Sequence, residues 1–487
     1  MPIPEAAVTD TLEVLAEAGN IKDSESLLTN FITSPTDRQR HLHVKAHLKA
    51  TPPDVMPTTA LNVLHAYEEK ALFAPMQTYT RCITALFHSP STLSRAQGWD
   101  LFMHMRYVAH PDPDVYLYTQ MIRACAYPLK SSYPSEPEKA LDIWTEMTVD
   151  RKLEPTIRAY NAVILACAKS GETVYVNEAY RLAKQMMDAF RDARGVSAFG
   201  PNKNTFIALL QGAKRVRDLG RARWILAEIV RGTSSGMVAD EDRGISVDEE
   251  IMMHLFQTYA RYQPPFERRA TVVLQGENGS APAQGEKSSV QVAEVSSTAE
   301  TPGPIDAAGS STSTNSDKSA LTPESIPNFP HIPPQSPEEV IREATYLFQQ
   351  ILHDTGIIPI PSEHHNGSSH PSPGLIGKFS NVTLTPRLLA SYMSVSFWHA
   401  SIALSEKMFW TVFDQLNVPK TARVYVEALE ACGCRKRGNG GEVAVKFADD
   451  LWAKWREMED SRRDVDKVLS ARMIERAYVA KVRVDAK

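Results

Sequence analysis

Apolar residues recur along most of the chain three or four positions apart, which is the spacing of an amphipathic helix. Two examples are the segments ALDIWTEM, which begins at Ala140, and AYRLAKQM, which begins at Ala179. Such spacing places the apolar side chains on one face of a helix, where neighbouring helices can cover them. No convincing run alternates apolar and polar residues as a half-buried strand does. The pattern therefore predicts an all-α protein.

The predicted helices form an internal repeat. Four stretches of ten residues align without gaps, and two weaker copies follow them. The second position of each copy holds an aromatic residue or, once, a methionine: Tyr79, Tyr118, Tyr160, Phe206, Met252 and Tyr425. From Tyr79 to Met252 these positions are 39 to 46 residues apart, which is enough for two helices and their turns. A single helix pair cannot bury its apolar face alone, so we expect the pairs to stack into an α-solenoid.

Two low-complexity segments interrupt the repeat. Residues 275–337 are rich in Ser, Thr, Pro and Gly and cannot bury enough apolar surface to offset their ordering entropy. The helix that begins at Pro337 is expected to be the partner of the Met252 helix, because solenoid loops tolerate insertions. The expected organisation is degenerate repeats at 1–75, core repeats at 76–262, a disordered linker at 263–337, a helix completing a repeat at 338–358, a disordered loop at 359–381 and degenerate repeats at 382–487.

The charge balance narrows the range of functions. The 53 basic and 58 acidic residues give a net charge of −5, so any nucleic-acid site must be a local patch. Five cysteines make no disulfide framework in a chain of this length, which favours a reducing compartment. No apolar run is long enough to predict a membrane span. The sequence contains no glycine-rich phosphate loop, G-x-S-x-G elbow or kinase signature, so an enzyme is not expected.

Three features of the repeat resemble a known family. The first helix opens with YT or YN at Tyr79, Tyr118 and Tyr160, the second helix has the form WDLFMHM or ALDIWTEM, and a P-D or P-N turn follows at Pro113 and Pro201. Over residues 76–259 the chain thus resembles the pentatricopeptide repeat family, of the fungal or animal organellar type. The tetratricopeptide repeat is the main competitor, but its W-x-x-L-G-x-x-Y signature is not evident. The resemblance implies binding of single-stranded RNA on the concave face, with one base read per repeat.

The resemblance also implies which side chains read the bases. In that family they are the residue after the opening aromatic and the last residue before the next repeat. The corresponding pairs in this chain are Thr80 with Asp114, Thr119 with Thr156, Asn161 with Asn202, and Ile207 with Asp248. The first pair resembles a guanine reader and the third a pyrimidine reader, whereas Ile207 can form no hydrogen bond. The alternative for the polar residues is ordinary capping of helices and turns.

A basic cluster adds an independent indication of RNA binding. The segment KRVRDLGRAR contains a single acidic residue and five basic ones: Lys214, Arg215, Arg217, Arg221 and Arg223. Such a cluster can bind phosphates and release their condensed counterions. A solvated turn between two helices explains it equally well.

Histidines raise the question of a metal. His43 and His47 are four residues apart and would share a helix face, but no third ligand can be identified from the sequence. His364, His365 and His370 lie in an irregular, glycine-containing stretch and suggest a metal by composition alone. We therefore predict no metal site and no cofactor.

The resulting hypothesis is a non-catalytic protein that binds a mitochondrial transcript or rRNA and acts in RNA processing, stability or translation, with the mitochondrial ribosome as a candidate partner. The localisation depends on the resemblance alone, because the N-terminus is acidic and lacks the arginines of a transit peptide. The alternative is an α-solenoid scaffold, such as a ribosome-associated or assembly factor, which the acidic net charge and Ile207 favour. A Mg²⁺-dependent RNA nuclease is a weaker third hypothesis.

Overall fold

The computed structural model describes residues 5–129, 134–188, 200–234, 246–265, 332–357, 377–435, 441–463 and 471–486. Within these ranges the regular structure consists of nineteen α-helices and one π-helical turn, with no strand. No helix in the described ranges is both long and apolar enough to cross a bilayer. The prediction of an all-α protein is confirmed.

The helices alternate between two rows, which we call the inner and the outer row. The inner row contains α1 (Glu5–Ala18), α3 (Asp37–Ala50), α5 (Met76–His88), α7 (Val115–Cys125), α9 (Ile157–Ser170), α11 (Lys203–Val216), α13 (Glu249–Arg261), α15 (Pro386–His399), α17 (Ala422–Arg435) and α19 (Ala471–Asp485). The outer row contains α2 (Ile21–Phe31), α4 (Thr58–Glu69), α6 (Thr92–Val108), α8 (Pro137–Thr145), α10 (Thr173–Asp188), α12 (Leu219–Ser234), α14 (Pro337–Asp354), α16 (Ile402–Gln415) and α18 (Gly441–Arg463). The π-helical turn, Glu146–Asp150, continues α8.

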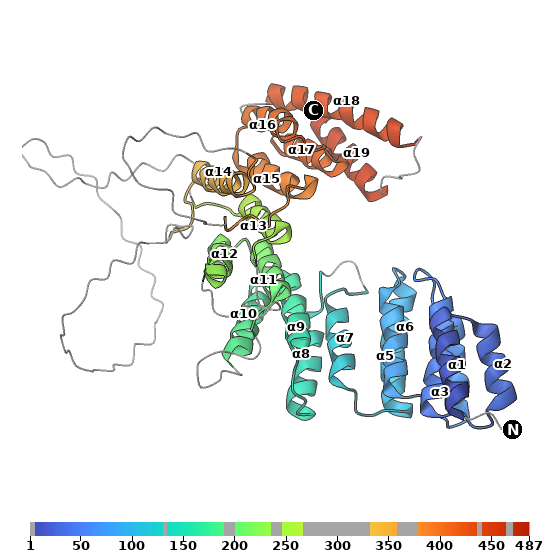
Figure 1. The fold of residues 1–487 in the computed structure, drawn as a ribbon. Coiled ribbons are helices and arrows are strands. Elements are labelled where there is room, and N and C mark those ends of the chain that lie inside the picture. Colours follow the sequence, from blue (N-terminus) through green and yellow to red (C-terminus); the bar gives the residue numbers. More distant parts are fainter. Residues whose placement is uncertain are drawn as a thin grey trace, which may run out of the picture.

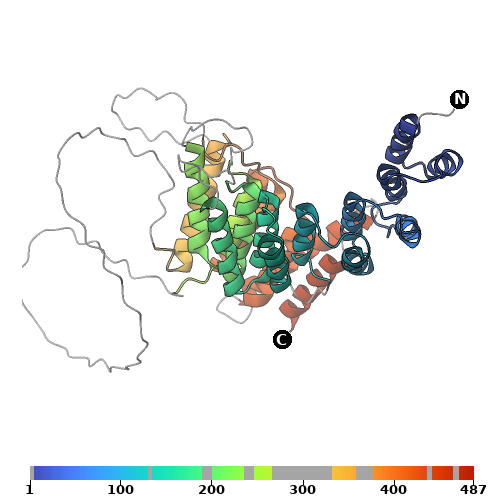
Figure 2. The ribbon, with the colours of Figure 1, turned by 90° about the horizontal axis from the view of Figure 1, so that it is seen from below.

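Stacking along the inner row gives the molecule its shape. Each inner helix packs against the next inner helix, and each outer helix packs against the inner helix that precedes it. Figure 1 shows the result as an arc, with α9, α11 and α13 on its inner side and α10, α12 and α14 on its outer side. Figure 2 shows the same helices from below, with the two termini well apart. The predicted α-solenoid is confirmed.

The aromatic positions of the repeat form a continuous core. All six are buried, and none is more than 8% exposed: Tyr79, Tyr118, Tyr160, Phe206, Met252 and Tyr425. Small residues beside them allow the inner helices to approach closely. A Cβ atom added to Gly212 on α11 would lie 3.1 Å from the Cβ of Ala168 on α9. The burial of equivalent side chains in successive helices explains why the repeat is visible in the sequence.

Helix α14 packs on α13, although a long segment separates the two helices in the sequence. Phe256 and Phe348 pack edge to face with ring centroids 6.3 Å apart, and the Tyr259 hydroxyl donates to Glu343 at 2.6 Å. The predicted linker, 263–337, falls mostly outside the described residues, and the described chain resumes at Ile332. The carbonyl oxygen of Ile332 accepts a hydrogen bond from the Arg223 guanidinium at 3.3 Å.

The predicted loop at 359–381 also lies mostly outside the described residues. Its last residues are packed against α14, because Phe379 is buried and its backbone N–H donates to Asp354 at 3.1 Å. Residues 377–381 therefore differ from the predicted unstructured loop, and the apolar Phe379 accounts for the difference.

Candidate nucleic-acid interface

Four of the predicted base-reading residues are the N-caps of inner helices. They stand directly before α7, α9, α11 and α13, and their side chains accept hydrogen bonds from backbone N–H groups at 2.8 to 3.2 Å: Asp114, Thr156, Asn202 and Asp248. The capping role weighed from the sequence is thus present in the structure. A capping oxygen keeps further lone pairs, so capping and contact with a ligand are compatible.

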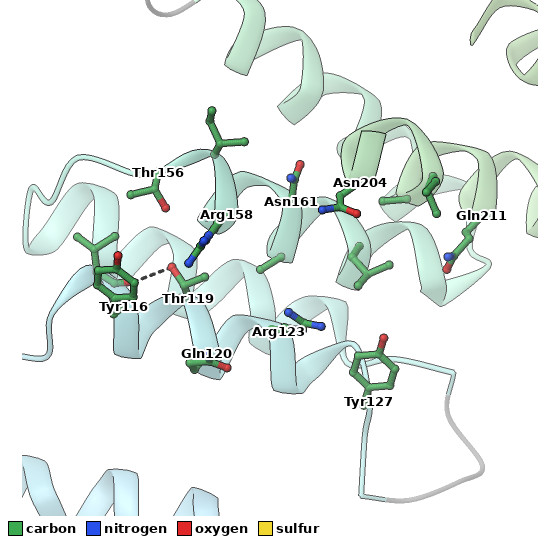
Figure 3. A pocket seen from close by; sticks show the side chains of 16 residues that line it. Tyr116, Thr119, Gln120, Arg123, Tyr127, Thr156, Arg158, Asn161, Asn204 and Gln211 are labelled. Atoms are coloured by element: carbon green, nitrogen blue, oxygen red, sulfur yellow. Dashed lines mark hydrogen bonds between the residues drawn. The ribbon is translucent and has the colours of Figure 1, made fainter. Parts of the chain in front are cut away.

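A groove of about 640 Å³ lies on the inner surface of α7, α9 and α11 (Figure 3). Four of the predicted residues line it: Thr119, Thr156, Asn161 and Ile207. The second residues of the three helices, Tyr116, Arg158 and Asn204, also line the groove. These are positions where the resembled family often has small branched side chains. The structure therefore brings predicted residues from three consecutive repeats to one surface.

The predicted pair of Asn161 and Asn202 is in direct contact. The Asn161 amide nitrogen donates to the Asn202 side-chain oxygen at 3.0 Å, and the Thr205 hydroxyl donates to the Asn161 side-chain oxygen at 2.6 Å. This network fixes the orientation of both amides. One amide N–H of Asn161 remains for a ligand, because its other N–H is the one that Asn202 accepts.

The two threonines that follow the opening tyrosines bond to their own helices. The Thr80 hydroxyl donates to the Met76 carbonyl at 3.2 Å, and the Thr119 hydroxyl donates to the Val115 carbonyl at 2.6 Å. Each hydroxyl oxygen can still accept a hydrogen bond. Ile207 is 7% exposed and offers only methyl groups to the groove. Thr80 lies on α5, outside the groove that Thr119 lines.

The predicted basic cluster is divided between the two rows. Lys214 and Arg215 are on the inner helix α11, where the Lys214 ammonium donates to Gln257 at 2.9 Å. Burial lowers the pKa of Lys214 to about 8 and also lowers that of Arg215, with Arg261 as the next cause for both. Arg217 is exposed at the C-cap of α11.

The other two members of the cluster are on the outer helix α12. Arg221 pairs with Asp218 at 3.2 Å, and its guanidinium lies 4.6 Å from the centre of the Tyr180 ring. Arg223 is only 4% exposed and forms an ion pair with Glu343 at 2.9 Å. The expectation of a phosphate contact at Arg223 is therefore not met, because its charge is already buried against α14.

A larger basic feature emerges when the inner helices are compared. Every inner helix from α3 to α15 has a basic residue in its last turn, and the set that we call the basic row is Lys49, His88, Arg123, Lys169, Lys214 and Arg215, Arg261, and His399. The helix dipole favours cations at this end of any helix. Among the outer helices, α2, α4, α8, α10 and α16 have none in their last turns, whereas α6 has Arg106 and α14 has His353.

Sequence reasoning missed most of the basic row because it searched only for contiguous charge. A signal was available: Lys49, Lys169, Arg215 and Arg261 each stand thirteen residues after an N-cap. Aligning the helices by their caps would have revealed it.

Lys169 connects the basic row to the groove. Its ammonium lies 3.6 Å from the centre of the Tyr127 ring, a groove residue that is 44% exposed. Burial, and after it the charges of Arg215 and Arg95, lowers the pKa of Lys169 to about 8. A cation and an aromatic face thus stand together at the end of the groove, where a phosphate and a base could be bound side by side.

Comparisons with known proteins add little to this description. No family model matches the sequence, and no curated protein matches it significantly. Among solved structures, the chain is similar to the pentatricopeptide repeat protein PPR10 in complex with an 18-nt psaJ RNA element, with 11% identity and a TM-score of 0.31 over 99% of this chain and 56% of that one. PPR10 from maize gives 12% identity and a TM-score of 0.31 over 99% of this chain and 67% of that one. The chain thus spans little more than half of the first of these proteins, and a TM-score this low does not assign a ligand.

Proposed function

We propose that the chain binds single-stranded RNA in the groove of α7, α9 and α11, with bases toward the groove and phosphates along the basic row. The observation that carries the proposal is the alignment of two features on successive inner helices. Polar side chains such as Thr119 and Asn161 line the groove, and cations such as Lys169 and Arg215 stand at the ends of the same helices. Cations that follow the backbone beside groups that contact bases are the usual arrangement for single strands.

Aromatic side chains support a single strand over a duplex. Tyr116 and Tyr127 both line the groove and are 65% and 44% exposed. Bases can stack on exposed aromatic rings only when they are free of a duplex, and such stacking is worth about 1–3 kcal/mol per base. The two tyrosines therefore favour unpaired bases as the ligand.

The inner surface changes character after α11, and this change supports a second candidate function. At the position that Asn161 occupies in α9, the later inner helices carry the buried apolar residues Met253, Ala390 and Val426. Trp398, at the end of α15, is 60% exposed. Buried apolar residues at this position offer no group that could read a base, and the exposed Trp398 suits a protein partner. A scaffold role for the C-terminal half is therefore the alternative, either beside RNA binding or in place of it.

For the cellular role, we propose that the RNA is a mitochondrial transcript or rRNA, and that binding serves its processing, stability or translation without a catalytic step. The resemblance of the YT and YN openings to organellar pentatricopeptide proteins supports this role. Fractionation of cells that express a tagged full-length protein, with a mitochondrial matrix marker, tests the localisation. Co-sedimentation with mitochondrial ribosomal subunits tests the ribosome as a partner.

The RNA experiment compares charge-matched variants by fluorescence anisotropy with randomised single-stranded RNA. The inner variant is Lys169→Gln/Lys214→Gln/Arg215→Gln. The control, Arg181→Gln/Lys184→Gln/Arg342→Gln, removes the same charge from the outer helices α10 and α14. We expect the inner variant to bind at least tenfold more weakly, with the slope of log affinity against log salt reduced by about 0.7 per lost phosphate contact. The control should bind like the unmodified chain.

Selection and sequencing of bound RNA then separates base reading from phosphate contact. Asn161→Ala is expected to relax the preference at one base and leave the salt slope unchanged. Equal losses in the inner and control variants would contradict the proposed groove. Absence of any salt-sensitive RNA binding by the unmodified chain would favour the scaffold.

A further inference from the structure

Two histidines and a glutamate converge between α2 and α3. His43 and His47 are one turn apart on α3, with ring centroids separated by 5.2 Å. Glu25 reaches them from α2, and its carboxylate lies 3.4 Å from Nε2 of His47. One ligand atom from each residue lies within 4.8 Å of the others. The third ligand that the sequence could not identify is thus supplied by a different helix.

Three of the four imidazole nitrogens in this cluster lack a hydrogen bond. Nε2 of His43 and both ring nitrogens of His47 are buried with no hydrogen bond, and His47 is only 4% exposed. A buried polar atom without a hydrogen bond destabilises a fold, so three such atoms in one place require an explanation. A bound cation would satisfy a nitrogen on each ring at once.

A hydrogen bond orients one of the rings for such a role. Nδ1 of His43 lies 2.8 Å from the Tyr67 hydroxyl on α4. When Nδ1–H donates to that oxygen, the lone pair of Nε2 is free for a ligand. A ring nitrogen bonded in this way is the usual support of a metal-binding histidine.

We propose that Glu25, His43 and His47 bind a divalent transition-metal ion of the zinc class, which fastens α2 to α3. Two imidazoles and one carboxylate are a known donor set for zinc, and histidines four residues apart on a helix present their rings to the same ion. The fourth position is left for water. The Glu25 side chain is 52% exposed, which provides a path for the ion to enter. The role is structural, because the site joins two helices away from the groove.

A second cluster in the same region provides an internal control. In it, Nδ1 of His65 and Nε2 of His104 lie 2.8 and 2.9 Å from the same oxygen of Glu68, and the Tyr79 hydroxyl donates to the other oxygen. These nitrogens already have a partner in the carboxylate. The observation that carries the proposal is therefore missing from this cluster, although its residue types are identical.

The test titrates the metal-free full-length protein with Zn²⁺ against a chromophoric chelator. We expect one tight equivalent, and we expect Co²⁺ to give the visible absorption of a four-coordinate site. Glu25→Gln and His47→Ala should each weaken Zn²⁺ binding at least tenfold, whereas the matched control His104→Gln should keep the tight equivalent. Glu25→Gln changes a half-exposed side chain and guards against unfolding as the cause, and circular dichroism checks each variant.

A second measurement follows thermal unfolding. Zn²⁺ should raise the melting temperature of the unmodified chain and of His104→Gln, because it binds only the folded state, and should not raise that of Glu25→Gln. The proposal is overturned if the unmodified chain binds no Zn²⁺ at micromolar concentrations. It is equally overturned if Glu25→Gln retains the tight equivalent or if His104→Gln loses it.

Discussion

Lys169 and Lys214 are half-buried, and for each of them burial lowers the pKa to about 8. Both are fully charged only below that pH, so their attraction for phosphates is present at pH 7 and is lost as the pH rises through 8. We predict that RNA affinity, measured by anisotropy at constant ionic strength, falls several-fold between pH 7 and pH 9. Arginine remains charged throughout this range.

The variant Lys169→Arg/Lys214→Arg is the control for this effect. It should bind RNA at pH 7 and show a much flatter pH dependence. If the double arginine variant loses affinity as steeply as the unmodified chain, other groups are responsible and the two lysines do not contact the RNA.

Single residues were predicted from the sequence where a helix position determines the environment, and missed where the environment depends on a neighbouring helix. Asn161 and Asn202 lie in contact because the repeat fixes one at the start of a helix and the other at the cap of the next, while their reading of a base stays a prediction. The buried environment of Arg223 was not predicted, because a run of basic residues in the sequence does not reveal which of them lie on an inner helix and which on an outer helix. Its partner Glu343 is 120 residues away in the sequence.

At the scale of helices, Arg223 links α12 to α14, and we call this contact the α12–α14 joint. Its guanidinium contacts Glu343 on α14 and the carbonyl of Ile332 before it. We predict that Arg223→Ala lowers the free energy of unfolding by about 3 kcal/mol, because it leaves the buried Glu343 carboxylate without its cation. Urea unfolding monitored by circular dichroism measures the change.

Arg221→Ala is the comparison variant for this joint. It removes a more exposed ion pair with Asp218 from the same helix and should cost less than about 1 kcal/mol. Similar losses from the two variants would mean that burial of the Arg223 pair contributes nothing to the stability of the joint.

The repeat was recognised by the aromatic residue near the start of each inner helix, which we call the marker position. Inner helices with an aliphatic residue at that position were therefore not recognised. Helix α15 carries Leu389 at the marker position, four residues after its N-cap, and this leucine is as buried as the tyrosines of other repeats. Burial requires an apolar side chain of suitable volume and not an aromatic ring. The repeat therefore also includes inner helices that lack an aromatic residue at the marker position.

At the scale of the molecule, α13 and α14 contact each other directly. We predict that residues 268–329 can be replaced with a Gly-Ser linker of about 25 residues. The melting temperature should change by less than about 2 °C, and the RNA affinity should change less than twofold. The reason is that the contact between α13 and α14 is made by side chains of these two helices: Phe256, Phe348, Tyr259 and Glu343. Circular dichroism and anisotropy measure the two quantities.

The control combines the linker replacement with Glu343→Gln. This substitution weakens the contact between α13 and α14 and should therefore lower the melting temperature. A large loss of stability from the replacement alone would show that the removed residues contribute to the fold.

The solenoid could be predicted from the repeat, but its groove and its metal-binding candidate could not. Repeats report which side chains face the core, since burial of Tyr118 or Tyr160 recurs with a fixed period. The width of the groove and the meeting of Glu25 with His43 depend on distances between helices, which the period does not encode. Sequence patterns therefore predict the inner and outer rows of helices, whereas the groove and the candidate metal site can be found only from the three-dimensional structure.

The direct packing of α14 on α13, which are far apart in the sequence, has a consequence for heredity. Helix α13 packs against α11 on one side and α15 on the other, and α14 packs on it from outside. A gene divided between the codons for α13 and those for α14 would therefore yield two polypeptides with complementary apolar faces. Two such products could assemble into one particle, so this locus could undergo fission, or recombination with foreign coding sequence, and keep its architecture.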